Sequence, residues 1–222
     1  MLKSFPMKRI IFSLSLIVIL NACSVVDRLF PVSTEIPPSG TVLFSDTFSS
    51  NESGWNTWNQ NGSYVIYQAD GLRFFVDKPH LDFYSKPGYT FTDVRIEVEA
   101  IKIGGPDNNT FGVICRMRDE KNYYAFVISS DAYAGIIKVE DGVYQLINSE
   151  SMEFAPSVRQ GKAINSLVVT CQYNFLKLDI NGQNQFSIQD NSFTQGDVGL
   201  IAGSFEEPGV DIFFDNLTVF QP

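Results

Sequence analysis

The sequence is poor in the side chains that most often carry out acid–base and metal chemistry. Its 222 residues include one histidine, His80, and three cysteines. A zinc site needs about four ligands, mostly nitrogen or sulfur, and one histidine without a free cysteine pair does not supply them. No serine or cysteine nucleophile accompanies His80 in a recognisable setting, which argues against a Ser-His-Asp hydrolase.

Cationic side chains are also scarce. The chain has 16 Lys and Arg against 25 Asp and Glu, for a formal net charge of −9. Residues 1–22 hold three of the cations and no acid, so the remainder has 13 cations against 25 acids and a charge of −12. A surface of this charge does not attract nucleic acid or an anionic membrane surface. We therefore expect no nucleic-acid partner.

Long apolar runs are missing after the first 22 residues, so no later segment is expected to span a membrane. At the start, a positively charged segment precedes the apolar run Ile10–Leu20, a pattern typical of a signal peptide. The run ends in Leu20-Asn21-Ala22-Cys23, which resembles the lipobox of bacterial lipoproteins. The resemblance implies that residues 1–22 are a lipoprotein signal peptide and that Cys23 carries the lipid. The alternative is an ordinary secretory signal followed by a chance cysteine.

The rest of the chain divides into a tether and one domain. Residues 23–40 combine the predicted lipidated cysteine with a proline-containing stretch of little periodicity, which we interpret as flexible. Residues 41–222 show no internal repeat and no second domain. We expect an exported protein, lipid-anchored to the bacterial membrane and facing the periplasm or the cell exterior, whose only membrane contact is the anchor. The pattern leaves open whether this is an inner or an outer membrane.

Alternating apolar and polar residues dominate the domain. From Val94 to Val98, apolar residues occupy every second position, as in a half-buried antiparallel strand. Asn181-Gly182 and Asp141-Gly142 separate neighbouring apolar runs and are strong hairpin signals. No window shows a convincing helical period. About a dozen short strands without helices predict an all-β fold, a two-sheet antiparallel jelly-roll sandwich.

The cysteine count is odd until Cys23 is assigned to lipid. Cys115 and Cys171 then remain as a pair in an oxidising compartment, where a disulfide is the natural state. Both lie in alternating apolar runs, so a bridge within one sheet or across the core is possible. Two buried free thiols are the alternative.

Three stretches, in order, resemble the concanavalin A-like lectin/glucanase superfamily, including its laminin-G-like and keto-disaccharide-hydrolase-type domains. They are Leu43–Phe48 with the following Gly54-Trp55, Phe111–Arg116 with the following Tyr123–Phe126, and Gly196–Ala202 with the closing Asp211–Phe220. The resemblance covers nearly all of residues 41–222. It implies a concanavalin A-like sandwich whose first and last strands are neighbours. It does not imply one activity, because this fold hosts lectins, glycosidases and structural modules.

A glucanase of this superfamily would need two carboxylates flanking a glycosidic bond, in a pattern such as Glu-x-Asp-x-x-Glu. The chain lacks that pattern. Glu97 and Glu99 share one face of their predicted strand with Arg95, which is typical of a solvated strand face. We therefore name no catalytic residue and expect no enzyme, with a glycoside hydrolase as the alternative.

Calcium is the one cofactor that the resemblance brings into consideration. Related domains often hold a structural calcium where the first and last strands meet. Asp46 and Asp215 stand at matching places here, and oxygen ligands suit this ion. The alternative is that both aspartates accept hydrogen bonds that fasten the terminal strands.

Sugar binding requires an aromatic face to stack on a pyranose, with polar groups at its rim. Trp55 and Trp58 lie in an asparagine-rich stretch that fits a glycan-contacting loop. If the resemblance holds, Arg116, Arg118 and Tyr124 line the concave face of the central strands. The alternative is that Trp55 packs under the edge of the sandwich and Tyr124 is half-buried.

The sequence thus favours a surface-anchored, non-catalytic carbohydrate-binding or adhesion module, with a glycan or cell-envelope polysaccharide as its partner. The alternatives are a glycoside-active hydrolase of the keto-disaccharide-hydrolase type and a structural or protein-binding lipoprotein.

Overall fold

The computed structural model describes residues 35–222, so the predicted signal peptide and lipidation site at Cys23 lie outside the described residues. The described part forms sixteen β-strands and contains no helix that could cross a membrane. Its compact unit begins at Pro37, slightly before the predicted domain boundary at Thr41.

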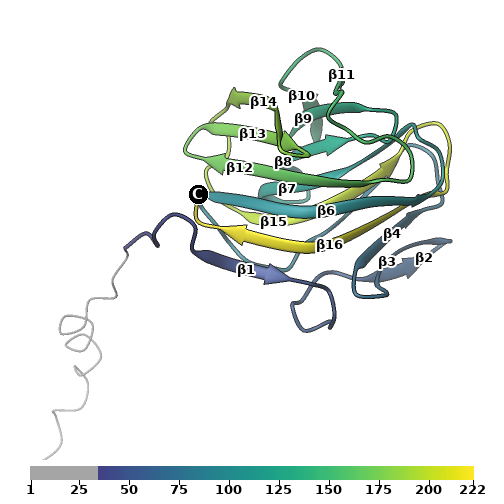
Figure 1. The fold of residues 1–222 in the computed structure, drawn as a ribbon, viewed down its shortest axis with the longest axis horizontal. Helices are drawn as coiled ribbons and strands as arrows, with labels where there is room; N and C mark the ends of the chain where they lie inside the picture. Colours follow the sequence, from purple (N-terminus) through teal and green to yellow (C-terminus); the bar gives the residue numbers. More distant parts are fainter. Residues whose placement is uncertain (1–34) are drawn as a thin grey trace, which may run out of the picture. The chain divides into compact units, whose positions relative to one another are not determined.

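The strands form two antiparallel sheets that pack as layers (Figure 1). The nine-stranded sheet has the order β14-β13-β12-β6-β16-β4-β3-β2, with β1 paired to β16. The seven-stranded sheet has the order β10-β9-β8-β7-β15-β5, with β11 paired to β9. The two-sheet, all-β architecture expected from the sequence is confirmed. The strands are β1 (Val42–Asp46), β2 (Trp58–Gln60), β3 (Ser63–Tyr67), β4 (Leu72–Val76), β5 (Leu81–Ser85), β6 (Val94–Gly104), β7 (Asn109–Asp119), β8 (Asn122–Ile128), β9 (Tyr133–Glu140), β10 (Val143–Leu146), β11 (Glu153–Phe154), β12 (Ile164–Gln172), β13 (Phe175–Ile180), β14 (Gln183–Gln189), β15 (Asp197–Ser204) and β16 (Val210–Phe220).

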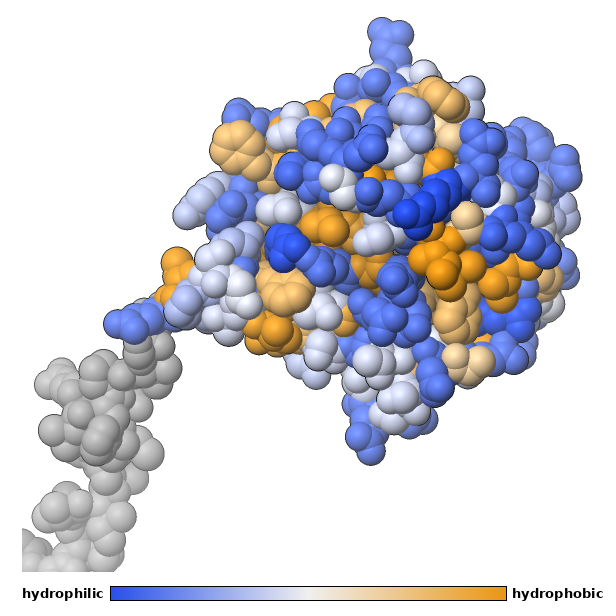
Figure 2. Space-filling view, in the orientation of Figure 1, coloured by the Kyte–Doolittle hydropathy of each residue, from blue (hydrophilic) through white to orange (hydrophobic). Residues whose placement is uncertain are grey.

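The main core lies between the sheets and follows the alternation in the sequence. In β6, Val94, Ile96 and Val98 are buried, while the charged residues between them are half-buried on the outer face of the nine-stranded sheet. Figure 2 looks onto the side of the molecule where β6 and β16 are in the foreground, and hydrophilic residues there alternate with apolar patches. The hairpin turns are confirmed, since Asn181 and Gly182 both have positive φ, as do Asp141 and Gly142.

The first and last strands are neighbours, as the resemblance implied. Val42 lies opposite Phe220, and the pairing continues to Asp46 opposite Leu217. Ahead of β1, the backbone N–H of Gly40 donates to the carbonyl of Gln221 at 2.8 Å. The end of the predicted tether is therefore fastened to the end of the chain.

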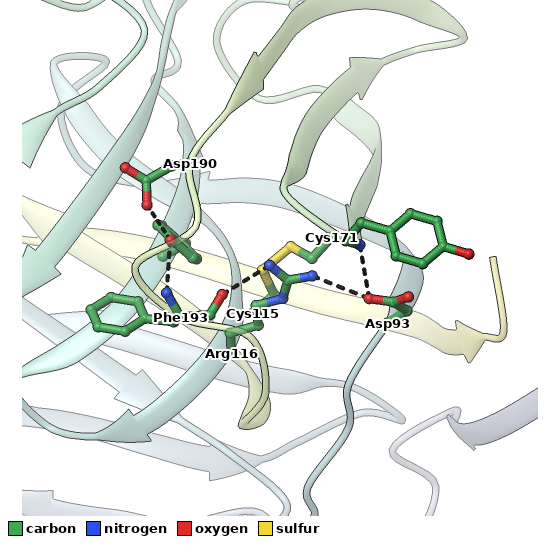
Figure 3. Close-up of a disulfide and its surroundings, with 8 residues drawn as sticks. Asp93, Cys115, Arg116, Cys171, Asp190 and Phe193 are labelled. Atoms are coloured by element: carbon green, nitrogen blue, oxygen red, sulfur yellow. Dashed lines mark hydrogen bonds and ion pairs between the residues drawn. A yellow bond between two sulfur atoms is a disulfide. The ribbon is translucent and has the colours of Figure 1, made fainter. Parts of the chain in front are cut away.

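The disulfide joins the two sheets across the core. Cys115 belongs to β7 of one sheet and Cys171 to β12 of the other, and their Cα atoms are 6.8 Å apart (Figure 3). The sequence left open a bridge within one sheet, a bridge across the core, or two free thiols. The structure has the bridge across the core.

Next to the disulfide, Arg116 interrupts the regular alternation of β7. Its φ is +54°, and the β7–β8 register shifts between Cys115 and Asp119, which marks a β-bulge. The guanidinium turns inward, where the residue is 1% exposed. It donates to the carbonyl of Phe193 at 2.9 Å and to Oδ1 of Asp93 at 3.2 Å (Figure 3). Arg116 thus fastens β7 to the segment before β6 and to the β14–β15 loop.

Removing the disulfide should cost substantial stability. The bridge closes a loop of 56 residues, for which the chain-entropy model gives about 4 kcal/mol. We expect the double variant Cys115→Ala/Cys171→Ala to lose about that much free energy of unfolding in urea titrations. The unmodified protein with a reductant should unfold like the variant, and an unchanged midpoint in both would contradict the prediction.

Arg116 should matter for stability far more than its neighbour Arg118. Arg116→Ala leaves the Asp93 carboxylate and the Phe193 carbonyl without their buried donor, so we expect a loss of about 3 kcal/mol. Arg118→Ala, at an exposed position of the same strand, should stay within about 0.5 kcal/mol of the parent. Comparable losses in the two variants, measured by thermal or urea unfolding, would argue against this role.

Candidate functional site

The outer face of the seven-stranded sheet carries a second apolar cluster, separate from the main core. Ile114, Ala125, Val127 and Ile201 form its centre and are at most 2% exposed. Tyr84, Ile137 and Met152 pack against this cluster from β5, β9 and the loop before β11. This face of the sheet is therefore covered by side chains rather than exposed to solvent.

Two hollows flank this cluster, and both are lined by Asp82. We call them together the groove. The larger hollow has a volume of about 870 Å³, and the smaller one about 550 Å³. Aromatic and polar residues line the larger hollow, among them His80, Asp82, Thr110, Tyr144, Glu150 and Phe205. The smaller hollow is lined by Asn56, Trp58, Gln60, Asp82, Phe83, Tyr84, Lys86, Asp119 and Glu120.

Three tyrosines form a connected row beside the groove. The Tyr123 and Tyr144 hydroxyls are 3.2 Å apart, and the rings of Tyr84 and Tyr123 are 6.5 Å apart between centroids. Tyr123 is buried, whereas Tyr144 is 56% exposed. Burial, helped by a hydrogen bond to Glu120, raises the pKa of Tyr84 to about 12. Burial also raises the pKa of Tyr123. Both hydroxyls therefore stay protonated near neutral pH and can donate hydrogen bonds.

Asp82 occupies a special position on β5 because the residue opposite it is a glycine. Asp82 pairs with Gly203 of β15, and Gly203 pairs with Thr110 of β7. A Cβ built on Gly203 would lie 1.7 Å from Oδ1 of Asp82 and 2.9 Å from Cγ2 of Thr110. The missing side chain is thus what allows the Asp82 carboxyl to lie across the strand. Burial of that carboxyl raises its pKa, although the residue as a whole is open to solvent.

The two basic residues of the groove each lie beside an acid. Nε2 of His80 is 3.3 Å from Oε2 of Glu206, and both side chains are exposed. Nζ of Lys86 donates to Oδ2 of the buried Asp197 at 3.2 Å. The groove therefore presents acidic and hydrogen-bonding side chains against an apolar, aromatic lining.

Of the five side chains predicted to contact a ligand, one reaches the groove. Trp58 lies in the short edge strand β2, is half-buried against Phe83 with ring centroids 4.5 Å apart, and lines the smaller hollow. Arg118 is exposed, with its guanidinium 5.9 Å from the ring centroid of Phe193, and lines neither hollow.

The prediction that Arg116 and Tyr124 line an open, concave face of the central strands is wrong, because both are buried. Tyr124 pairs with Cys115 and shares its core-facing side of the sheet, where it is fully buried. Its hydroxyl donates to Asp190 and accepts from the backbone N–H of Phe193. The bulge at Arg116 turns that side chain inward as well. Both residues hold the β14–β15 loop and offer no surface to a sugar.

Trp55 is buried, as the alternative to a glycan-contacting role had it, and the reason involves Asp46. Trp55 is 4% exposed, and its indole N–H donates to Oδ2 of Asp46 at 2.9 Å. Oδ1 of Asp46 accepts the backbone N–H of Phe48. Both oxygens of this buried carboxylate thus face N–H donors, an arrangement that fastens the end of β1 to the loop that follows it.

Asp46 and Asp215, the two aspartates considered for calcium, both accept hydrogen bonds within the protein. Asp215 lies opposite Glu99 and accepts the backbone N–H of Asn216, while Asp46 is occupied by the indole of Trp55. Within residues 35–222 no group of three or more His, Cys, Asp or Glu side chains is arranged to hold a metal. Calcium binding at Asp46 and Asp215 stays a prediction.

The carboxylates considered for catalysis belong to the sheet that does not carry the groove. Glu97 and Glu99 belong to β6 of the nine-stranded sheet, whereas the groove is built on the other sheet. Glu97 pairs with Arg95, and Glu99 accepts from the side chain of Asn216. They form the solvated strand face that their alternation indicated.

The sequence reasoning missed the residues that build the groove, namely Asp82, Tyr84, Thr110, Tyr123 and Tyr144. The available signal was the strand Tyr123–Ile128. Its residues are apolar at both odd and even positions, so both of its faces must be covered by other side chains.

No protein-family model and no curated protein sequence matches the chain. Solved structures do resemble it. The carbohydrate-binding module CBM66 from Bacillus subtilis is 18% identical with a TM-score of 0.61, and the match covers 76% of this chain and 96% of that one. A Bacillus subtilis protein of unknown function with a galectin-like fold is 12% identical with a TM-score of 0.64, covering 84% and 98%. Bacillus licheniformis β-glucanase is 12% identical with a TM-score of 0.56, covering 83% and 100%. At these identities the likeness shows the fold alone: the domain is a concanavalin A-like jelly-roll sandwich.

Proposed function

We propose that this chain is a surface-anchored lipoprotein whose sandwich binds a glycan without cleaving it. The groove on the seven-stranded sheet is the binding site. Its ligand is a saccharide or cell-envelope polysaccharide, held by stacking and hydrogen bonds.

The aromatic rim of the groove is the observation that carries the proposal. Tyr144 and Phe205 line the larger hollow, and Trp58 and Tyr84 line the smaller one. Aromatic faces bind the apolar side of a pyranose, while carboxylates, amides and hydroxyls bind its hydroxyl groups. Both kinds of group are present within each hollow. The fold is also that of the carbohydrate-binding module CBM66, which supports the proposal.

A glycoside hydrolase is the second candidate because one feature of the groove favours it. The Asp82 carboxyl has a pKa raised by burial, the property expected of a general acid. Release of reducing ends from a bound oligosaccharide, abolished in Asp82→Asn, would replace binding by hydrolysis as the function.

Replacing the rim aromatics should weaken glycan binding. We expect Tyr144→Ala and Trp58→Ala each to raise the dissociation constant about tenfold for a ligand that occupies both hollows. A ligand confined to one hollow should respond to only one of the two changes. The measurement is a glycan array on the chain from Ser24 onward, with and without calcium, followed by calorimetry on the best ligand.

Tyr173→Ala is the matched control, because Tyr173 is 72% exposed in the β12–β13 turn and lines neither hollow. This variant should bind like the parent. No binding on a broad array in either condition would leave a structural or protein-binding lipoprotein as the function.

The lipid anchor depends on Cys23. Since the thiol would receive the lipid, we expect Cys23→Ala to move the protein from the membrane fraction to the soluble fraction. Membrane retention of this variant in cell fractionation would contradict lipidation and favour an ordinary secretory signal.

A further inference from the structure

Asparagine followed by glycine occurs twice in the chain, at Asn61-Gly62 and at Asn181-Gly182. Each pair forms a two-residue turn between neighbouring antiparallel strands, the first between β2 and β3 and the second between β13 and β14. The two asparagines have almost the same left-handed φ, +54° at Asn61 and +50° at Asn181. The turns therefore match in sequence and in φ, and they differ in what surrounds them.

Asparagine before glycine is prone to deamidation, because glycine has no side chain to hinder attack by its backbone nitrogen. That nitrogen forms a bond to Cγ of the asparagine, and the Cγ–Nδ2 bond breaks. The amide group leaves as ammonia and takes the proton of the attacking nitrogen. Water then opens the resulting succinimide at either carbonyl, which leaves aspartate or isoaspartate. Ring closure requires the asparagine backbone to leave the turn conformation, so a turn reacts when it opens locally.

The turn at Asn181 is held closed by its surroundings. The side-chain amide donates to the carbonyl of Ser157 and to Oδ1 of Asn165, both at 2.8 Å. Oδ1 of Asn181 accepts the backbone N–H of Ser166 at 3.0 Å, and the backbone N–H of Asn181 donates to the carbonyl of Ser166 at 2.8 Å. Six residue pairs join β13 to β14 beyond the turn. Opening this turn breaks contacts to three segments of the chain.

The turn at Asn61 lacks this support. Asn61 is exposed, and within residues 35–222 its side chain has no hydrogen-bond partner. Strand β2 is three residues long, lies at the edge of the nine-stranded sheet and, in the described part of the chain, pairs with β3 alone. Short, exposed edge elements open at the lowest free-energy cost. The turn at Asn61 therefore opens far more often than the turn at Asn181.

We propose that Asn61 is a site of spontaneous deamidation, with water as the co-reactant and ammonia as the by-product. The reaction adds a carboxylate to a turn beside which Asp77 already lies, since a Cβ built on Gly62 would be 2.6 Å from Oδ2 of Asp77. The isoaspartate product also inserts one backbone atom into a two-residue turn, whose length fixes the register of the two strands. Modification at Asn61 therefore loosens the pairing of β2 with β3.

The reaction has a consequence for the groove, because β2 carries Trp58 and Gln60, which line the smaller hollow. Once β2 is loosened, both side chains are held less firmly in that hollow. This consequence rests on the proposed glycan-binding function, whereas the reaction at Asn61 does not.

The test follows both asparagines in one sample of the purified protein, incubated at mildly alkaline pH. Peptide mapping by mass spectrometry, with separation of asparagine, aspartate and isoaspartate, gives the two rates. We expect Asn61 to react at least about tenfold faster than Asn181 in the folded protein. In urea, where neither turn persists, the two rates should lie within about threefold of each other. The unfolded sample is the matched control, because it removes the structure and keeps the sequence around each asparagine.

A variant then connects the reaction to the groove. Asn61→Gly has no side-chain amide to lose, and glycine also suits the left-handed position of this turn. For a glycan that occupies the smaller hollow, we expect the affinity of the parent to fall during incubation toward that of Trp58→Ala. The affinity of Asn61→Gly should stay constant, and an equal loss in this variant would overturn the link to the groove.

A rate at Asn61 equal to or below that at Asn181 in the folded protein would overturn the proposal. So would an Asn61 that stays intact in the folded protein while the sample in urea deamidates. A lack of glycan binding would count against the proposed function alone, because the deamidation rates are measured without a ligand.

Discussion

Strand β7 is buried on both of its faces, and the position of the groove depends on this. One face packs into the core between the sheets, and Ile114 on the other face belongs to the outer cluster. An outer sheet face that is apolar must be covered, and here the cover comes from tyrosines and the β10–β11 loop. The hollows remain where that cover stops. The candidate binding site thus lies where the covering side chains end, rather than on an open sheet.

Much of the fold was accessible from the sequence because it rests on local patterns. The period of two in β6 and the Asn-Gly and Asp-Gly turns each require only a few adjacent residues. The cysteine pair was also recognisable, although only the three-dimensional structure shows that it joins the two sheets. The prediction that the first and last strands are neighbours came from the resemblance.

The candidate site was harder to predict. It depends on which face of each strand points inward and on contacts between residues that are distant in the sequence. A single bulge at Arg116 reverses which side of β7 faces inward, so counting residues along the strand gives the wrong face. Trp55 is drawn inward by Asp46, nine positions earlier in the chain. Gly203 resembles any other glycine in the sequence, yet its value lies in the space that it leaves beside Asp82. None of these relations produces a recognisable pattern in the sequence.

The placement of β1 bears on how several copies would act together. β1 belongs to the nine-stranded sheet, so the chain joins the domain on the layer opposite the groove. Under the proposed lipid anchor, copies of the domain would lie beside one membrane plane. Neighbouring copies in one membrane plane would then hold the same polysaccharide at several points. Such multivalent attachment converts weak individual contacts into strong overall avidity.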